Sequence, residues 1–155
     1  MPEHLLFDLP ITTDFGIDWV MDQMMNQKPT SPEYQSIQLL EMKKTKTIYE
    51  YHYRPDSLHW LGFFLPKNFL LPLLHFTNEA IYDKETNQVR FKLTNIGEKK
   101  VYDIFIHIRF LGNQCSMELL EFNIFHSFSV PEFVKTRIIQ HLLRQIRDDL
   151  LTLFL

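Results

Sequence analysis

The chain has 155 residues, which is enough for one domain with a complete hydrophobic core. Hydrophobic residues make up 45% of the sequence and charged residues 23%, proportions that exclude a disordered or fibrous chain. The formal net charge is −3, and the 16 Lys and Arg residues form no basic block that would support nucleic-acid binding. We therefore expect a single domain over residues 1–155 that has no nucleic-acid partner.

The apolar fraction is unusual in its makeup, because 14 Phe, 6 Tyr, 2 Trp and 6 Met stand against only 4 Gly. Large flat or flexible apolar side chains suit either a core built around a cavity or a surface that contacts lipid. An ordinary core rich in aromatic residues is the alternative that composition leaves open.

The cysteine content and the first residues of the chain indicate the cellular compartment in which the protein is expected. Cys115 is the single cysteine, so no internal disulfide can form and a reducing compartment is expected. The first residues, 1–4, do not begin a basic stretch followed by an apolar stretch, which is the pattern of a secretory signal, so we expect no such leader. These features predict an intracellular, cytoplasmic protein.

Apolar periodicity predicts the elements in chain order. Residues 5–11 alternate between apolar and polar and predict a first strand, and residues 14–28 have the spacing of an amphipathic helix that ends at prolines. Ser31 is placed to cap a further short turn at residues 32–34. Six antiparallel strands joined by polar turns then follow, at residues 36–42, 47–53, 75–82, 88–95, 101–110 and 115–128.

The last 26 residues predict a long helix. Pro131 suits the first turn of a helix, and apolar residues then recur at every fourth position from Val134 to Phe154. Such a stripe needs a broad apolar surface to cover it. A strongly curved antiparallel sheet wrapped around this helix meets that need, and it leaves space between sheet and helix that side chains need not fill.

Residues 58–76 are nearly long and apolar enough to span a bilayer as a helix. Pro66 and Pro72 interrupt the segment, and Lys67 lies near its middle, where a charge is costly in hydrocarbon. We therefore expect a buried connection or a loop that touches a membrane, and no spanning helix.

Short motifs in the middle of the chain resemble a known family. They are Trp60-Leu61-Gly62 followed by Leu65-Pro66, the run Asn78-Glu79-Ala80-Ile81-Tyr82-Asp83, and residues 90–95. The order of elements resembles the START-like, helix-grip (SRPBCC) superfamily over nearly the whole chain, and these motifs resemble its PRELI-like phospholipid-transfer family. Residues 28–32 depart from that family's Tyr-Pro-Asn-Pro-like stretch, and the glycine-rich loop of pollen-allergen-like carriers is absent.

The resemblance implies an α+β helix-grip fold, with a curved antiparallel sheet of about seven strands around the long C-terminal helix. It also implies a lid that meets the membrane and admits a lipid, formed by Trp60, Phe63, Phe64, Leu65 and Lys67. An aromatic residue, apolar side chains and a cation suit that contact, and packing under the sheet edge is the alternative. Membership of the PRELI-like family would place the protein in the mitochondrial intermembrane space.

The candidate ligand-binding residues are polar side chains on predicted strands. We expect them to contact the polar head of a ligand inside the cavity. The alternatives are that the charged and His residues face solvent and that the tyrosines are present only because tyrosine is favoured in strands. The candidates are Tyr49, Tyr51, Arg90, Lys92, His107 and Arg109. The seven His residues show no spacing typical of a metal site, and we expect no metal and no cofactor. No nucleophile elbow, phosphate loop or dinucleotide fingerprint is present, so catalytic residues are not assigned.

The sequence thus predicts a protein that binds a lipid or another hydrophobic ligand between sheet and helix and, further, transfers it between membranes. Its partners would be a hydrophobic small molecule or phospholipid and, transiently, a membrane. Two alternatives remain open: a cyclase or aromatase of the same fold that uses cavity side chains as acid and base, and a protein-interaction module with a filled core.

Overall fold

The structure is a computed structural model that describes residues 4–9, 34–43, 45–54, 65, 67–83, 85–125 and 130–153. The predicted first helix and its following turn lie largely outside these residues. So do three residues of the predicted lid, Trp60, Phe63 and Phe64.

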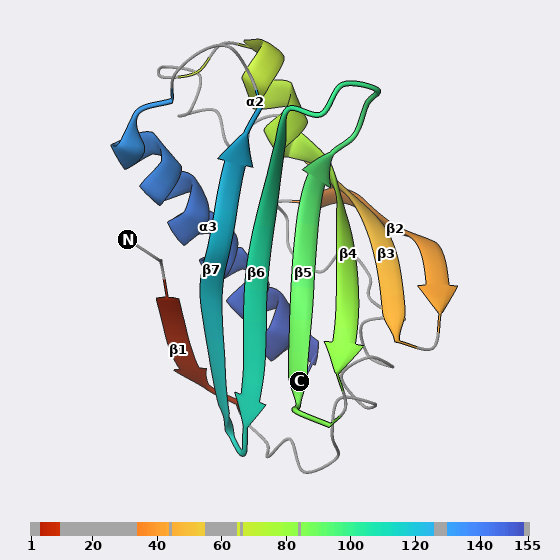
Figure 1. Cartoon of the computed structure of the whole chain (residues 1–155), viewed down its shortest axis with the longest axis vertical. Helices are drawn as coiled ribbons and strands as arrows, with labels where there is room; N and C mark the ends of the chain where they lie inside the picture. The colour runs from red at the N-terminus through yellow and green to blue at the C-terminus, as the bar shows by residue number, and fades with distance from the viewer. Residues whose placement is uncertain are drawn as a thin grey trace.

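A single seven-stranded sheet dominates the described part of the chain, and every pairing within it is antiparallel. Its strands run in the order β1-β7-β6-β5-β4-β3-β2, so that the first strand joins the last and β2 forms the opposite edge (Figure 1). The strands are β1 (His4–Asp8), β2 (Tyr34–Lys43), β3 (Lys46–Tyr53), β4 (His75–Asp83), β5 (Gln88–Asn95), β6 (Tyr102–Leu111) and β7 (Gln114–Ile124).

Helix α3 (Glu132–Leu153) crosses one face of this sheet (Figure 1). The predicted stripe faces the sheet: Val134 is fully buried, and Ile138, Leu142, Ile146 and Leu150 are each less than one-tenth exposed. Burial of such side chains contributes about 1.5–3 kcal/mol each before chain entropy is subtracted. The inner face of the sheet therefore supplies the broad apolar surface that the helix pattern required.

Alternation of side chains along the strands defines that inner face. On β4 the side chains of Phe76, Asn78, Ala80 and Tyr82 are buried, while those between them are half-buried or exposed. Register shifts interrupt the ladder: an extra residue lies on β2 between Leu39 and Glu41, and another lies on β7 opposite Phe105/Ile106. Bulges of this kind bend a strand and increase its twist, which helps the sheet to curve around α3.

Helix α2 (Lys67–Leu74) occupies part of the segment tested above for membrane crossing. Phe69 is fully buried and Leu71 is exposed, so the helix covers the core with one face. Pro72 lies near its C-terminal end, and the phenol of Tyr102 donates a hydrogen bond of 2.8 Å to the Pro72 carbonyl oxygen. Within the described ranges, each helix is too short or too polar to cross a membrane.

Candidate functional site

A pocket lies between the sheet and α3, at the end of α3 that contains Asp149. Its cavity volume is about 30 Å³. Strands β2 to β5 and helix α3 supply the lining, which consists of Tyr34, Tyr51, Tyr53, Phe76, Asn78, Phe91, Leu93, Leu142, Ile146, Asp149 and Leu150. We call this the tyrosine pocket.

A hydrogen bond between a phenol and a carboxylate joins two elements of the tyrosine pocket. The Oη of Tyr34, at the start of β2, donates to Oδ2 of Asp149 on α3 at 2.5 Å. Gln145, one turn earlier on α3, donates from Nε2 to Oδ1 of the same carboxylate at 3.0 Å. Both oxygens of Asp149 are thus hydrogen-bonded, and the edge strand β2 is tied to α3.

Burial controls the ionisation of these groups. Loss of hydration raises the pKa of Asp149 from an ordinary 3.8 to about 6, and the neighbouring Asp148 adds to the rise, while the hydrogen bonds from Tyr34 and Gln145 oppose it. Burial likewise raises the pKa of the Tyr34 phenol well above 10, with further contributions from Tyr53 and Asp149. At neutral pH the pocket therefore contains a phenol that donates and a carboxylate that accepts.

Aromatic rings form one wall of the tyrosine pocket. The rings of Tyr34 and Tyr53 stack with their centroids 4.9 Å apart, and the rings of Tyr51 and Phe76 stack at 5.3 Å. Stacked pairs of this kind contribute about 0.5–1.5 kcal/mol beyond their buried area. The wall is consequently an apolar surface of packed rings that also carries phenol groups.

Asn78 places a polar side chain among these apolar groups. It faces α3 from β4, between Tyr49 on β3 and Leu93 on β5, and only 4% of its surface is exposed. Its Oδ1 is buried and accepts no hydrogen bond from any residue that the structure describes. A buried acceptor in this state costs about 1–3 kcal/mol.

A second pocket adjoins the first beneath α3. Its cavity volume is also about 30 Å³. Both pockets are lined by Tyr53, Phe76, Leu93 and Leu142, so these four side chains separate them. Displacing those side chains would join the two spaces.

The structure places the predicted tyrosines on the inner face of the sheet. Tyr51 lines the tyrosine pocket, and Tyr49 is buried on the same side of β3, opposite Asn78. Their phenols are deprived of water, which raises the pKa of both. Tyr51 is therefore part of the candidate site, whereas Tyr49 supports it from the core.

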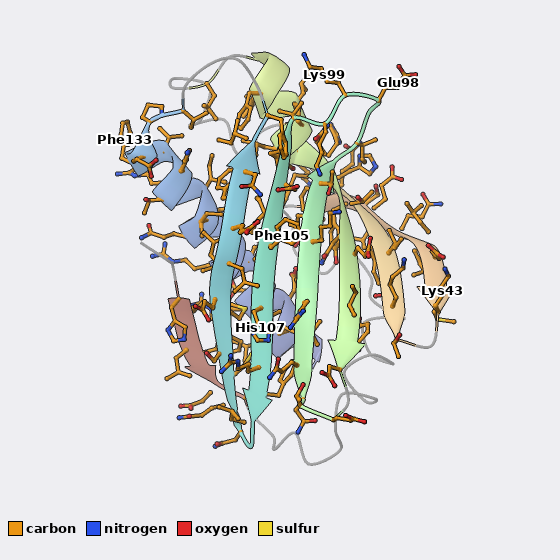
Figure 2. The ribbon with its side chains drawn as sticks, in the orientation of Figure 1. Lys43, Glu98, Lys99, Phe105, His107 and Phe133 are labelled. Carbon is orange, nitrogen blue, oxygen red and sulfur yellow. The ribbon has the colours of Figure 1, made fainter. Side chains whose placement is uncertain are left out.

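The predicted cationic and imidazole ligands lie on the outer face. His107 lies on β6 (Figure 2), between Ile106 and Ile108, whose buried side chains face α3. Its direct cross-strand partner on β5 is Arg90. Arg109 follows at the next outer position of β6, and Lys92 lies over the ring of Phe105 at 5.8 Å. The prediction that Arg90, Lys92, His107 and Arg109 line the space between sheet and helix is therefore wrong.

His107 has an evident role on that outer face. Its Nε2 lies 2.6 Å from Oε1 of Gln88 on the neighbouring strand. Burial lowers the pKa of His107, and the cations of Arg109 and Arg90 lower it further. These effects outweigh the nearby Glu118, which raises the pKa, so the surroundings favour the neutral imidazole, which is hydrogen-bonded within the sheet.

The lid prediction concerns residues that are only partly described. Leu65 is 6% exposed and belongs to the core, so in this structure it packs inside the protein instead of facing a membrane. Lys67 begins helix α2, and its side chain lies outside the described part, as do Trp60, Phe63 and Phe64.

Sequence reasoning missed three polar residues of the tyrosine pocket. Tyr34 was expected in a short turn, but it is the first residue of β2. Asn78 interrupts the alternating apolar face of β4, and Asp149 follows Ile146 by three positions, at the margin of the apolar stripe of α3. Those interruptions are the signals by which both residues could have been found.

No group of three or more His, Cys, Asp or Glu side chains is placed to hold a metal ion among the residues that the structure describes. Cys115 is fully buried, and loss of hydration raises the pKa of its thiol to about 12. A thiol in that environment is chemically inert.

Comparison with known proteins identifies the fold. No protein-family model and no curated protein matches this sequence. Among solved structures, Ara h 8.0201 aligns over 99% of this chain and 95% of its own, with a TM-score of 0.62 and 9% identity. The Zhui aromatase/cyclase from Streptomyces sp. R1128 aligns over 99% of this chain and 92% of its own, with a TM-score of 0.55 and 8% identity.

The class that these similarities define is the helix-grip fold, as predicted: a seven-stranded antiparallel sheet with a long C-terminal helix. Neither similar structure supports the finer resemblance to PRELI-like proteins. At 8–9% identity the similarity establishes the fold alone.

Proposed function

We propose that this protein binds a small hydrophobic molecule between the inner face of its sheet and α3. The observation that carries the proposal is the tyrosine pocket, in which aromatic and aliphatic walls surround the polar side chains of Tyr34, Asn78 and Asp149. Apolar walls with a few placed polar groups are typical of small-molecule sites. The helix-grip fold of the two similar structures is consistent with this use.

Binding requires the pocket to expand. The present space admits about one or two water molecules, so a larger ligand must displace the shared wall of Tyr53, Phe76, Leu93 and Leu142. Each 100 Å² of apolar surface that leaves water contributes about 2.5 kcal/mol, from which the costs of ordering and repacking are subtracted. A ligand that fills both pockets would itself pack against the side chains that it displaces, and this packing would offset part of those costs.

Transfer of a lipid between membranes is the finer form of this proposal. Its support is the chemistry of residues 58–67, where Trp60, Phe63, Phe64 and Lys67 combine an interfacial aromatic, apolar side chains and a cation. Replacing Trp60 and Phe63 with alanine should then slow the transfer of a fluorescent phospholipid between liposomes. Equal rates for the variant and the wild type would contradict transfer while leaving ligand binding intact.

The binding proposal is tested with the uncharged dye N-phenyl-1-naphthylamine, whose fluorescence rises in apolar surroundings. Leu93→Trp adds bulk to the wall shared by the two pockets and should weaken dye binding at least about 10-fold. Lys92→Ala changes the outer face of the same strand and should leave binding unchanged. Circular dichroism verifies that both variants are folded.

Two results would count against the proposal. One is dye binding that is equally strong in the Leu93→Trp variant and the wild type. The other is a failure of the wild type to bind the dye, together with native mass spectra that show no associated small molecule.

A second candidate function, acid–base catalysis of the aromatase/cyclase type, is favoured by the Tyr34–Asp149 pair. A carboxylate with a pKa of about 6 in an apolar pocket is suited to remove a proton from carbon, and the Tyr34 phenol, which donates its hydrogen to that carboxylate, holds it in place. The test is exchange of the α-protons of 2-tetralone in D₂O, followed by NMR. Asp149→Asn should abolish any exchange that the wild type catalyses, and an unchanged exchange rate would exclude Asp149 as the base.

A further inference from the structure

The acceptor of Asn78 indicates what kind of ligand the tyrosine pocket selects; this inference rests on the ligand binding proposed above. Asn78 lines the pocket, is 4% exposed, and holds its Oδ1 without a hydrogen-bond partner among the described residues. Burying a polar atom without a partner is unfavourable, so a ligand that donates a hydrogen bond to Oδ1 removes a cost already present in the protein.

Two further polar groups of the pocket also favour a donor. The carboxylate of Asp149 accepts hydrogen bonds, and the Tyr34 phenol already directs its hydrogen to that carboxylate, which leaves the phenol oxygen as an acceptor. The described lining contains no Lys or Arg side chain. The cations Arg90 and Lys92 lie on the opposite face of β5, where they cannot neutralise an acid inside the pocket.

We propose that the tyrosine pocket selects hydrophobic molecules that carry a hydrogen-bond donor, an alcohol, phenol or amine, and that it rejects carboxylates such as fatty acids. The donor group lies against Asn78 Oδ1, and the apolar body contacts the wall of Phe76, Leu93 and Leu142. A carboxylate in the same position would face the unpaired Oδ1 and the negative charge of Asp149 without a compensating cation.

Four compounds with one ring system test this selection: naphthalene, 2-naphthol, 2-naphthylmethylamine and 2-naphthoate. Their dissociation constants are measured at pH 7 by equilibrium dialysis. A donor that satisfies a buried acceptor should strengthen binding about 10-fold, so 2-naphthol should exceed naphthalene by that factor and 2-naphthoate should bind more weakly than either. The tighter of the hydroxyl and ammonium compounds identifies the donor that the pocket prefers.

Asn78→Leu is the informative variant, because leucine keeps the volume and removes the acceptor. In this variant the preference for 2-naphthol over naphthalene should fall to within about 2-fold, while naphthalene binding persists. Thr77→Val is the matched control: Thr77 is the neighbour on the outer face, where its hydroxyl donates to the Thr94 carbonyl oxygen, and its loss should leave the preference intact.

The wild-type series decides the inference even if Asn78→Leu fails to fold. The inference is overturned if naphthalene or 2-naphthoate binds the wild type as tightly as 2-naphthol does, or if none of the four compounds binds. In either case the proposed function stands as long as N-phenyl-1-naphthylamine still binds and is excluded by Leu93→Trp. An unchanged preference in a folded Asn78→Leu variant would also overturn the role of Asn78.

Discussion

Replacing Asp149 with asparagine should make the protein more stable at neutral pH. The change keeps the shape of the side chain and removes a carboxylate whose pKa is raised from 3.8 to about 6, chiefly by burial. A difference of that size corresponds to about 3 kcal/mol at 1.36 kcal/mol per pKa unit. Asparagine retains one oxygen for the hydrogen bond from Tyr34, so the tie between β2 and α3 is kept. Its NH2 group replaces the oxygen that accepts from Gln145, and rotation of the Gln145 amide brings an oxygen to that position.

The sign of the pH dependence follows from the direction of the shift. Because the folded-state pKa of Asp149 lies above its unfolded value, the carboxyl favours folding below about pH 4 and loses that contribution as the pH rises through 6. The wild type should therefore lose about 2–3 kcal/mol from this group between pH 4 and pH 7, and Asp149→Asn should not.

Urea unfolding at pH 4, 5, 6 and 7 measures this effect. The difference in unfolding free energy between Asp149→Asn and the wild type should grow with pH across that range. Asp148→Asn makes the same chemical change at the adjacent exposed residue and should stay within about 0.5 kcal/mol of the wild type. A difference that is constant with pH, or that favours the wild type increasingly toward pH 7, would refute the reasoning.

Three further predictions concern the site and the core. Tyr34→Phe removes the 2.5 Å hydrogen bond to Asp149, so in urea titrations at pH 7 it should lower stability by about 1.5–3 kcal/mol; no loss would show that the bond is not formed in solution. Ile106→Ala, in the core of β6, should cost about 2–5 kcal/mol in the same titrations, against less than about 0.5 for the exposed Leu111→Ala, and equal costs would contradict the assigned faces. Cys115 should react with Ellman's reagent only on unfolding, and rapid reaction in native buffer would place the thiol at the surface.

The strands, in their order along the chain, and the C-terminal helix were predictable because each has a regular apolar period. The stripe from Val134 to Leu150 repeats at every fourth residue, and polar turns such as residues 84–87 separate the alternating runs. Helix α2 was not predicted, because Pro66 and Pro72 make residues 66–74 resemble a loop. Its packing against the core, with Phe69 fully buried, outweighs that local preference.

The candidate ligand-binding residues on β5 and β6 were chosen from the outer face for a different reason. Arg90, Lys92, His107 and Arg109 were considered for the cavity because a ligand's head needs polar partners, whereas alternation alone assigns them to the face opposite Ile106 and Ile108. The apolar alternation was the stronger signal, since a buried cation without a partner is costly.

The site itself depends on contacts that no local pattern contains. Tyr34 and Asp149 are 115 residues apart in the sequence, and they meet because β2 lies at the sheet edge under the last turns of α3. The isolated polar positions of Asn78 and Asp149 were visible in the sequence, but which groups they face was not. Only the sheet order and the position of α3 bring them into one pocket.

Methyl NMR during titration with 2-naphthol tests most directly whether the ligand enters between the sheet and α3. The methyl groups of Leu93, Leu142 and Ile146 line the tyrosine pocket, while those of Ile81 and Leu120 are exposed. Binding as proposed should shift the three inner residues and leave the two exposed ones unchanged. Shifts confined to Ile81 and Leu120, with the inner methyl groups unaffected, would contradict a ligand site beneath α3.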